Sequence, residues 1–292
     1  MNQGFSSDDP AGMGDQGTSQ KEKARKLRKR LHSGDPFMVP EAWDVASARI
    51  FADAGHDVIG ISATAVAWSN GYQPQERVSL PELMAVTERI MVNFAPPLIA
   101  DLEGVLDRAP EEVGEAAAKV LSFGCSGISF SDGGRNGAHG MSALEHMAAC
   151  VKAVKAAAVE AKIPAVIAAR TDAFLLGPRG NSPFETSVER SEAYFAAGAD
   201  CVIVPGLQQI QIIERLVGVV DGPLGIAIGL TPAPDFKSLG KAGVACVTLG
   251  PTLMRSLLGM MRLRAEELIA FGHFNNLERA IPEDQLMILL RR

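Results

Sequence analysis

The feature that most constrains the fold is a unit that recurs along the chain: a short apolar segment, then a helical pattern. The apolar segments are bounded by Gly, Pro or charged residues, which is typical of buried strands. Eight are predicted, at 37–40, 57–62, 97–101, 127–131, 165–170, 200–205, 223–228 and 244–250. The helical patterns cover 43–54, 81–93, 110–123, 141–162, 184–197, 208–219, 234–242 and 251–271. This alternation favours a (β/α)8 barrel over a doubly wound open sheet, since no G-x-G-x-x-G follows a strand.

Several of the predicted helices end in the same way. A glycine after Ala or Phe stands just before the next strand at Gly55, Gly124, Gly198 and Gly243. Glycine adopts the left-handed conformation that ends a helix and turns the chain back toward a parallel strand.

The chain divides into three parts by composition. Residues 1–19 are rich in Gly, Ser, Asp and Gln and are expected to be a disordered tail, residues 20–272 form the barrel, and residues 273–292 are an extension that contributes to oligomer contacts. Residues 21–31 are a basic helix. The spacing of Leu27 and Leu31 favours an amphipathic lid across one end of the barrel, with a nucleic-acid patch as the alternative.

Charge and cysteine content narrow the class of protein. A formal charge of -6 gives no case for nucleic acid or an anionic membrane, and no apolar run is long enough to cross a bilayer. The four cysteines have no C-x-x-C spacing and are expected to be reduced thiols of a cytoplasmic protein. Small-molecule chemistry is the default expectation.

Polar residues gather where the predicted strands end, which is where a barrel carries its chemistry. Asp101 and Glu103 follow one strand, and since alternate residues of an extended chain point the same way, both can face one divalent cation. Ser62, Ser131 and Arg170 end other strands, and the guanidinium suits a substrate carboxylate. The simpler alternatives are a helix cap at Asp101, a solvated Glu103, and a local ion pair between Arg170 and the nearby aspartate at 172.

Several motifs together resemble the isocitrate lyase/phosphoenolpyruvate mutase superfamily. They are Val39-Pro40-Glu41-Ala42-Trp43-Asp44, Val66-Ala67-Trp68-Ser69-Asn70-Gly71-Tyr72, Ala100-Asp101-Leu102-Glu103-Gly104, Gly127-Ile128-Ser129-Phe130, Ala169-Arg170-Thr171-Asp172-Ala173-Phe174 and Val204-Pro205-Gly206-Leu207. The resemblance runs from about residue 21 to 272. It implies a (β/α)8 barrel in a tetramer whose eighth helix is exchanged between subunits, Mg²⁺, and a bond made or broken beside a pyruvate-like enolate.

The resemblance also implies roles for particular residues. Asp101 is a direct or water-mediated metal ligand and Glu103 its outer-shell partner. Trp43, Ser62, Ala63 and Arg170 bind substrate, with Ser62 and the backbone after it as a cradle for a carboxylate or oxyanion.

The chain departs from the family pattern at the expected metal site. Pro74 stands where related sequences have an acid, and Ser131 replaces a metal-shell glutamate, so Mg²⁺ affinity is expected to fall. The lyase signature with a catalytic cysteine is missing. Residues 133–140, which include His139, take its place and resemble a gating loop.

Three functions remain open from the sequence. The first is a lyase acting on a small 2-oxo or 2-hydroxy acid, breaking or forming a C–C bond or, as the other option, a C–P bond, with Asp101, Glu103, Ser131 and His139 as catalytic residues. The second is a metal-independent enzyme that uses Asp101, Glu103 or His139 for acid–base chemistry. The third is a catalytically silent barrel that binds a partner. The apolar stripe of 251–271 and the apolar end of the chain predict a homo-oligomer, a dimer of dimers.

Overall fold

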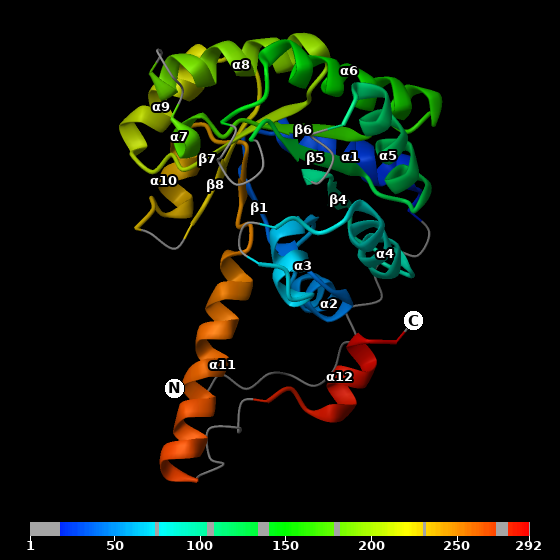
Figure 1. Ribbon diagram of the computed structural model, residues 1–292, viewed down its shortest axis with the longest axis vertical. Coiled ribbons are helices and arrows are strands. Elements are labelled where there is room, and N and C mark those ends of the chain that lie inside the picture. Colours follow the sequence, from blue (N-terminus) through cyan, green and yellow to red (C-terminus); the bar gives the residue numbers. More distant parts are fainter. Residues whose placement is uncertain are drawn as a thin grey trace.

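The computed structural model describes residues 18–73, 76–103, 108–133, 140–177, 182–229, 232–272 and 280–291. These residues form one parallel sheet closed into a barrel and surrounded by helices, as Figure 1 shows. The described strands are β1 Phe37–Val39, β2 Glu41–Ala42, β3 Ile59–Ile61, β4 Leu98–Asp101, β5 Gly127–Ser131, β6 Val166–Arg170, β7 Cys201–Pro205, β8 Leu224–Ala227 and β9 Cys246–Thr248. The predicted (β/α)8 barrel is confirmed.

The first barrel strand is divided in two. Pro40, which has no N–H to donate, separates β1 from β2. β1 pairs with β9, whereas β2 pairs with β3, so these few residues join the two ends of the sheet. β1 and β2 therefore count as one strand of the barrel.

The helices largely follow the predicted ranges. They are α1 Gln20–Leu31, α2 Val45–Asp53, α3 Ala63–Ser69, α4 Leu80–Met91, α5 Pro110–Ser122, α6 Leu144–Glu160, α7 Ala173–Leu176, α8 Pro183–Ala197, α9 Ile210–Val219, α10 Phe236–Lys241, α11 Thr252–Phe271 and α12 Glu283–Leu289. Three short helices, α3, α7 and α12, were not predicted. The start of α6 at residue 141 was wrong, because Met141 forms a bridge with Gly133 and the helix begins only at Leu144.

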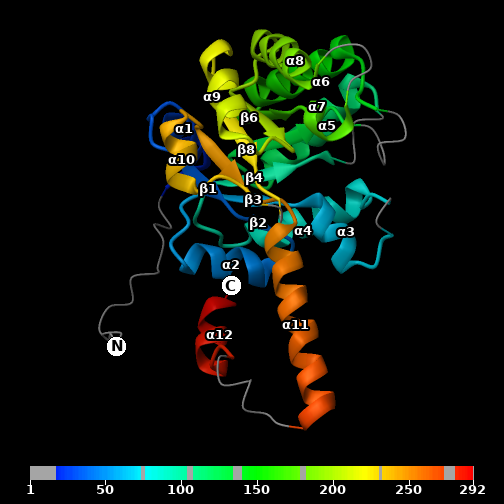
Figure 2. The ribbon, with the colours of Figure 1, turned by 90° about the vertical axis from the view of Figure 1, so that its left-hand side faces the viewer.

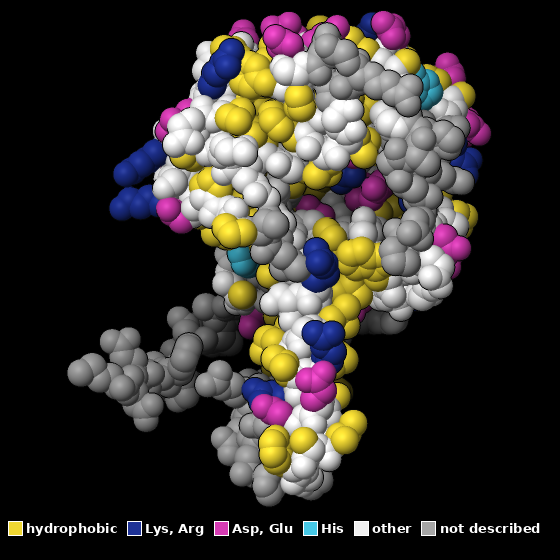
Figure 3. Space-filling model, turned by 60° about the vertical axis from the view of Figure 1, so that its left-hand side comes forward, with side chains coloured by type: hydrophobic (Ala, Val, Ile, Leu, Met, Phe, Trp, Pro, Cys, Tyr) yellow, Lys and Arg dark blue, Asp and Glu magenta, His cyan; other side chains and the backbone are white. Residues whose placement is uncertain are grey.

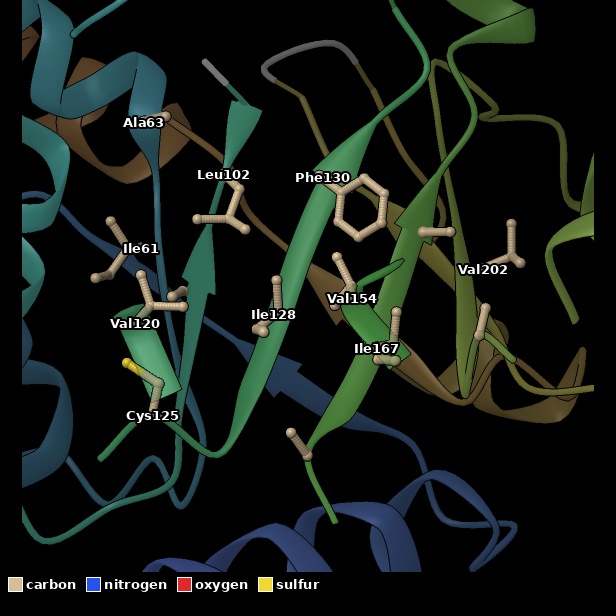
Figure 4. Close-up of a cluster of buried hydrophobic side chains, with 14 of the residues drawn as sticks. Ile61, Ala63, Leu102, Val120, Cys125, Ile128, Phe130, Val154, Ile167 and Val202 are labelled. Carbon is tan, nitrogen blue, oxygen red and sulfur yellow. The ribbon is translucent and has the colours of Figure 1, made fainter. Parts of the chain in front are cut away.

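Alternate strand residues face the barrel interior and the surrounding helices. Ile128 and Ile167 point outward, where α5 and α6 cover them with Val120 and Val154 (Figure 4). The inward set is a separate cluster that includes Val39, Val166, Ala168, Cys201 and Cys246. All four cysteines are buried free thiols, so the expectation of reduced cysteines agrees with the structure.

Helix α1 closes the amino-terminal end of the barrel, as the spacing of its leucines predicted. Leu27 and Leu31 are buried among the inward-facing strand residues. Arg28 donates to the Ala165 carbonyl and to Asp200, beside the start of β6. This lid leaves the opposite, carboxyl-terminal end of the strands as the mouth of the barrel.

The four predicted glycine caps are present. Gly55, Gly124, Gly198 and Gly243 have φ values of 92°, 104°, 108° and 83°, all in the left-handed region. A side chain at any of these positions would strain the turn that returns the chain to the next strand.

Helix α11 leaves the barrel and extends away from it, and α12 lies back near α2 (Figures 1 and 2). Only Met254 of α11 is buried, whereas Met261, Leu263, Ile269 and Phe271 are more than half exposed. Hydrophobic side chains are visible along this projecting helix in Figure 3. Among the described helices none is long and apolar enough to cross a bilayer.

Candidate active site

Asp101 ends β4 at the mouth of the barrel and is almost fully buried. Its Oδ2 accepts a hydrogen bond from the Ala63 backbone N–H at 3.2 Å, and its Oδ1 accepts one from the Glu103 N–H at 2.9 Å. Burial, with the charge of Glu103 added, raises the pKa of Asp101 to about 7. The carboxylate is therefore held in a fixed orientation, but its negative charge is poorly compensated.

Glu103 and Arg170 form an ion pair across the mouth. Arg170 Nη2 donates to Glu103 Oε1 at 3.2 Å, and Arg170 Nε donates to Asp172 Oδ1, also at 3.2 Å. Although burial opposes the charge on Arg170, Asp172 and Glu103 raise its pKa, so the guanidinium stays protonated. Arg170 Nη1 has no hydrogen-bond partner within the described part of the chain, and this leaves a donor for an incoming carboxylate.

Ser131 supports Asp172 and has no exposed surface. Its hydroxyl donates to Asp172 Oδ2 at 2.7 Å and accepts from the Gly133 N–H at 3.0 Å. The predicted catalytic hydroxyl is thus engaged on both sides and orients the aspartate that orients Arg170.

Two of the other predicted substrate-binding residues, Ser62 and Ala63, lie beside Asp101, and the Ser62 hydroxyl and the Ala63 N–H are already bonded. Ser62 caps α3 by accepting from the Ala65 N–H, and the Ala63 N–H is bonded to Asp101. The Trp43 ring packs edge-on against Phe51 of α2. His139 and Pro74 lie outside the described residues.

The sequence interpretation missed two residues of this site, Glu41 and Arg77. Glu41 of β2 lies over Gly60 of β3, where a Cβ on Gly60 would be 2.8 Å from Glu41 Cγ. Burial, followed by the charge of Asp101, raises the pKa of Glu41 to about 8. The alternation Phe37, Val39, Glu41 could have revealed it, because it puts the glutamate in line with inward-facing residues.

No sequence pattern pointed to Arg77, because it lies in the loop between α3 and α4, where residues do not alternate between two faces. It donates to the Glu103 carbonyl at 2.7 Å and to the Gly133 carbonyl at 3.0 Å. One guanidinium therefore ties together the segments that follow β4 and β5. Figure 3 shows acidic and basic side chains together in a recess of the molecule above the base of α11.

The donor set suits Mg²⁺ only if water and substrate supply most ligands. Within the described ranges, no group of three or more His, Cys, Asp or Glu side chains could hold a metal ion. Both carboxylate oxygens of Glu103 are already bonded, one to Arg170 and one to Thr64. Glu103 is therefore suited to contact a metal ion through water rather than directly. Asp101 offers the hard oxygen donor and the uncompensated charge that a divalent cation would neutralise, and Mg²⁺ commonly binds through one or two carboxylates.

A closed barrel with buried acids and an arginine at the carboxyl ends of its strands has the arrangement of (β/α)8-barrel enzymes, whose active sites lie at that end. The chain matches the phosphoenolpyruvate phosphomutase family over residues 27–269 and belongs to that family. The earlier resemblance to the isocitrate lyase/phosphoenolpyruvate mutase superfamily is confirmed.

Individual relatives support the same grouping. The chain is 27% identical to a 2-methylisocitrate lyase of Bacillus subtilis, over 76% of this chain and 75% of the relative. It is 29% identical to an oxaloacetate decarboxylase of Chromohalobacter salexigens, over 80% of each. The crystal structure of 2,3-dimethylmalate lyase is similar in fold, with a TM-score of 0.80 at 22% identity, covering 91% of this chain and 94% of that one.

Proposed function

We propose that this protein is a lyase that breaks or forms a bond, carbon–carbon in preference to carbon–phosphorus, next to a pyruvate-like enolate of a small 2-oxo or 2-hydroxy acid. The observation that carries the proposal is the position of Arg170, which is held by Glu103 and Asp172 at the barrel mouth and whose Nη1 is bonded to no described residue. Relatives named as a 2-methylisocitrate lyase and an oxaloacetate decarboxylase support this class of substrate.

Substrate binding, metal binding and positioning would be carried out by different residues of this chain. Arg170 binds the substrate carboxylate, and because its charge is fixed by two carboxylates it does so without reorganising. Asp101 and Glu103 would hold Mg²⁺, directly and through water. When bound, Mg²⁺ supplies positive charge that favours enolate formation. Ser131 keeps Asp172, and through it Arg170, in place.

The proposal is tested by incubating the protein and Mg²⁺ with a panel that includes oxaloacetate, 2-methylisocitrate and 2,3-dimethylmalate, and identifying cleaved acids by mass spectrometry. We expect turnover of at least one compound and its loss in Arg170→Ala. Removing one partner of a closed carboxylate–arginine pair costs about 2–5 kcal/mol, so the defect should appear mainly in substrate binding. The control is Arg89→Ala, which removes an exposed arginine on α4. Equal activity of Arg170→Ala and Arg89→Ala would contradict the proposal.

We also propose that the protein works as a homo-oligomer, a dimer of dimers. The support is the apolar surface of α11, on which Met261, Leu263, Ile269 and Phe271 are more than half exposed. A second copy of this chain, contributing the same helix in exchange, would cover that surface.

A further inference from the structure

A buried carboxylate, Asp132, lies behind the proposed active site at the end of β5. It has no exposed surface, and three donors converge on it. Its Oδ2 accepts from Arg190 Nη1 at 2.9 Å and from the Tyr194 hydroxyl at 2.6 Å, while its Oδ1 accepts from the Asp172 backbone N–H at 2.8 Å. Burial raises the pKa of Asp132, and the three donors oppose that rise by stabilising the carboxylate.

The network reaches the substrate side of the barrel in two further steps. The Asp172 N–H bonded to Asp132 fixes the backbone at the residue whose Oδ1 accepts from Arg170 Nε. The other oxygen of Asp172 accepts from Ser131. A displacement of Asp132 would therefore shift Asp172, one of the two carboxylates that hold Arg170.

Arg190 also contacts Ser142, which lies shortly before α6. Arg190 Nη2 donates to the Ser142 carbonyl at 2.9 Å, and the Ser142 N–H donates to the Asp132 carbonyl at 2.7 Å. Gly133 and Met141 form the isolated bridge just inside these contacts. Arg190 thus connects α8 to Asp132 and Ser142, which lie next to the two residues of this bridge.

We propose that Tyr194 and Arg190 of α8 are positioning residues for the proposed reaction: through Asp132 and Asp172 they set the orientation of the Arg170 guanidinium that binds the substrate carboxylate. This inference rests on the proposed function, in which Arg170 binds the substrate carboxylate. The orientation of Arg170 can nevertheless be measured without any substrate.

The chain offers a matched control at the opposite end of β6. Asp200 accepts from Arg28 Nη2 at 3.0 Å and from the Ile167 N–H at 3.0 Å, so it is also an aspartate paired with an arginine and bonded to a backbone N–H beside β6. The Arg28–Asp200 pair lies at the amino-terminal end of the barrel, away from Arg170. Arg28→Lys therefore shows how far changing an arginine–aspartate pair affects the protein when that pair is remote from Arg170.

The experiment compares Tyr194→Phe, Arg190→Lys and Arg28→Lys with the unaltered full-length protein. The first readout is the NMR signal of the Arg170 Nε–H group, assigned with Arg170→Lys. We expect the signal to shift and its exchange with water to accelerate in Tyr194→Phe and Arg190→Lys, and to remain unchanged in Arg28→Lys. The second readout is the Kd of oxalate, a small dicarboxylate probe, measured by calorimetry with saturating Mg²⁺. Loss of one hydrogen bond's net contribution predicts roughly three- to tenfold weaker binding in the two α8 variants.

The outcomes separate the two proposals. An Arg170 Nε–H signal that is the same in Tyr194→Phe, Arg190→Lys and Arg28→Lys would overturn the positioning role, even if all three variants melt at lower temperature. Oxalate binding that is indifferent to Arg170→Ala would count against the proposed function, while the NMR comparison would still decide the positioning role. Tyr194→Phe keeps the buried ring, so it serves if Arg190→Lys fails to fold.

Discussion

Arg170 of β6 and Glu103, just after β4, are joined by a 3.2 Å hydrogen bond that crosses over β5, the strand between them. The bond directly connects Arg170, which is expected to bind the substrate carboxylate, with Glu103, which is expected to contact the metal ion through water. Glu103 is compensated in this way whereas the neighbouring Asp101 is not, and the prediction for Asp101 below follows from that difference.

The first prediction concerns Ser131, which replaces a glutamate of the family pattern. Ser131→Glu would place a second carboxylate against Asp172 in a buried site, and a divalent cation would relieve the repulsion. We expect Mg²⁺ to raise the melting temperature of Ser131→Glu more than that of the unaltered protein. Ser131→Gln has nearly the same shape without the charge and should show no such gain. An equal response of the Glu and Gln variants to Mg²⁺ would place the cation elsewhere.

Asp101 itself gives a second prediction. Asp101→Asn keeps the size and one acceptor oxygen of the side chain but removes its charge, so Mg²⁺ binding measured by calorimetry should be lost along with turnover. Glu88→Gln, an exposed change on α4, is the control. Should activity survive both exhaustive chelation and Asp101→Asn, the metal-independent mechanism would be favoured.

The third prediction is a pH dependence of stability. Burial raises the pKa of Glu41 to about 8, above its ordinary value of 4.5, so the folded state holds a proton that the unfolded state has released. The folded state binds more protons between these values, and stability therefore falls as pH rises from about 4.5 to about 8. In chelator, Glu41→Gln should melt higher than the unaltered protein at pH 8.5, with the difference shrinking toward pH 5. A difference that does not change between these two pH values would contradict the assignment.

A fourth prediction tests the packing behind Arg170. A Cβ on Gly133 would lie 2.0 Å from Asp172 Oδ2, and Asp172 cannot retreat without breaking its bonds to Ser131 and Arg170. Gly133→Ala should therefore reduce oxalate binding and turnover severely. Gly218→Ala, in α9 with no atom within 4 Å of the added methyl group, should leave both unchanged and raise stability by up to about 1 kcal/mol.

The fifth prediction is the oligomeric state. Light scattering at micromolar concentration should give a tetramer, because α11 exposes an apolar surface that a monomer would leave in water. Ile269→Lys together with Phe271→Lys should shift the mass downward, whereas Arg262→Lys should not. A monomeric unaltered protein would contradict the proposal.

The sequence predicted the barrel because its signals are local: period-two apolar segments, helical stripes and glycine caps such as Gly198. It also predicted that Asp101, Ser131 and Arg170 would share one end of the barrel, since strand ends meet there. Short helices such as α3 and α7 carry too little periodicity to detect. The contacts that orient the site could not be found in this way. Tyr194 and Asp132 are 62 positions apart, and Tyr194 looks like an ordinary buried residue of an amphipathic helix until the fold brings them together.

The pairing of β1 with β9 has a consequence for how the protein is made. Residues 37–39 pair with residues 246–248, so the barrel cannot close until most of the chain has left the ribosome. Until then the edge of β1 has no partner, and an unpaired edge is a site for pairing with other chains. Synthesis of β9 is the step that removes this hazard. A nascent chain that stalls before residue 246 should be a substrate for chaperones, whereas one that stalls well beyond residue 248 should already be resistant to protease.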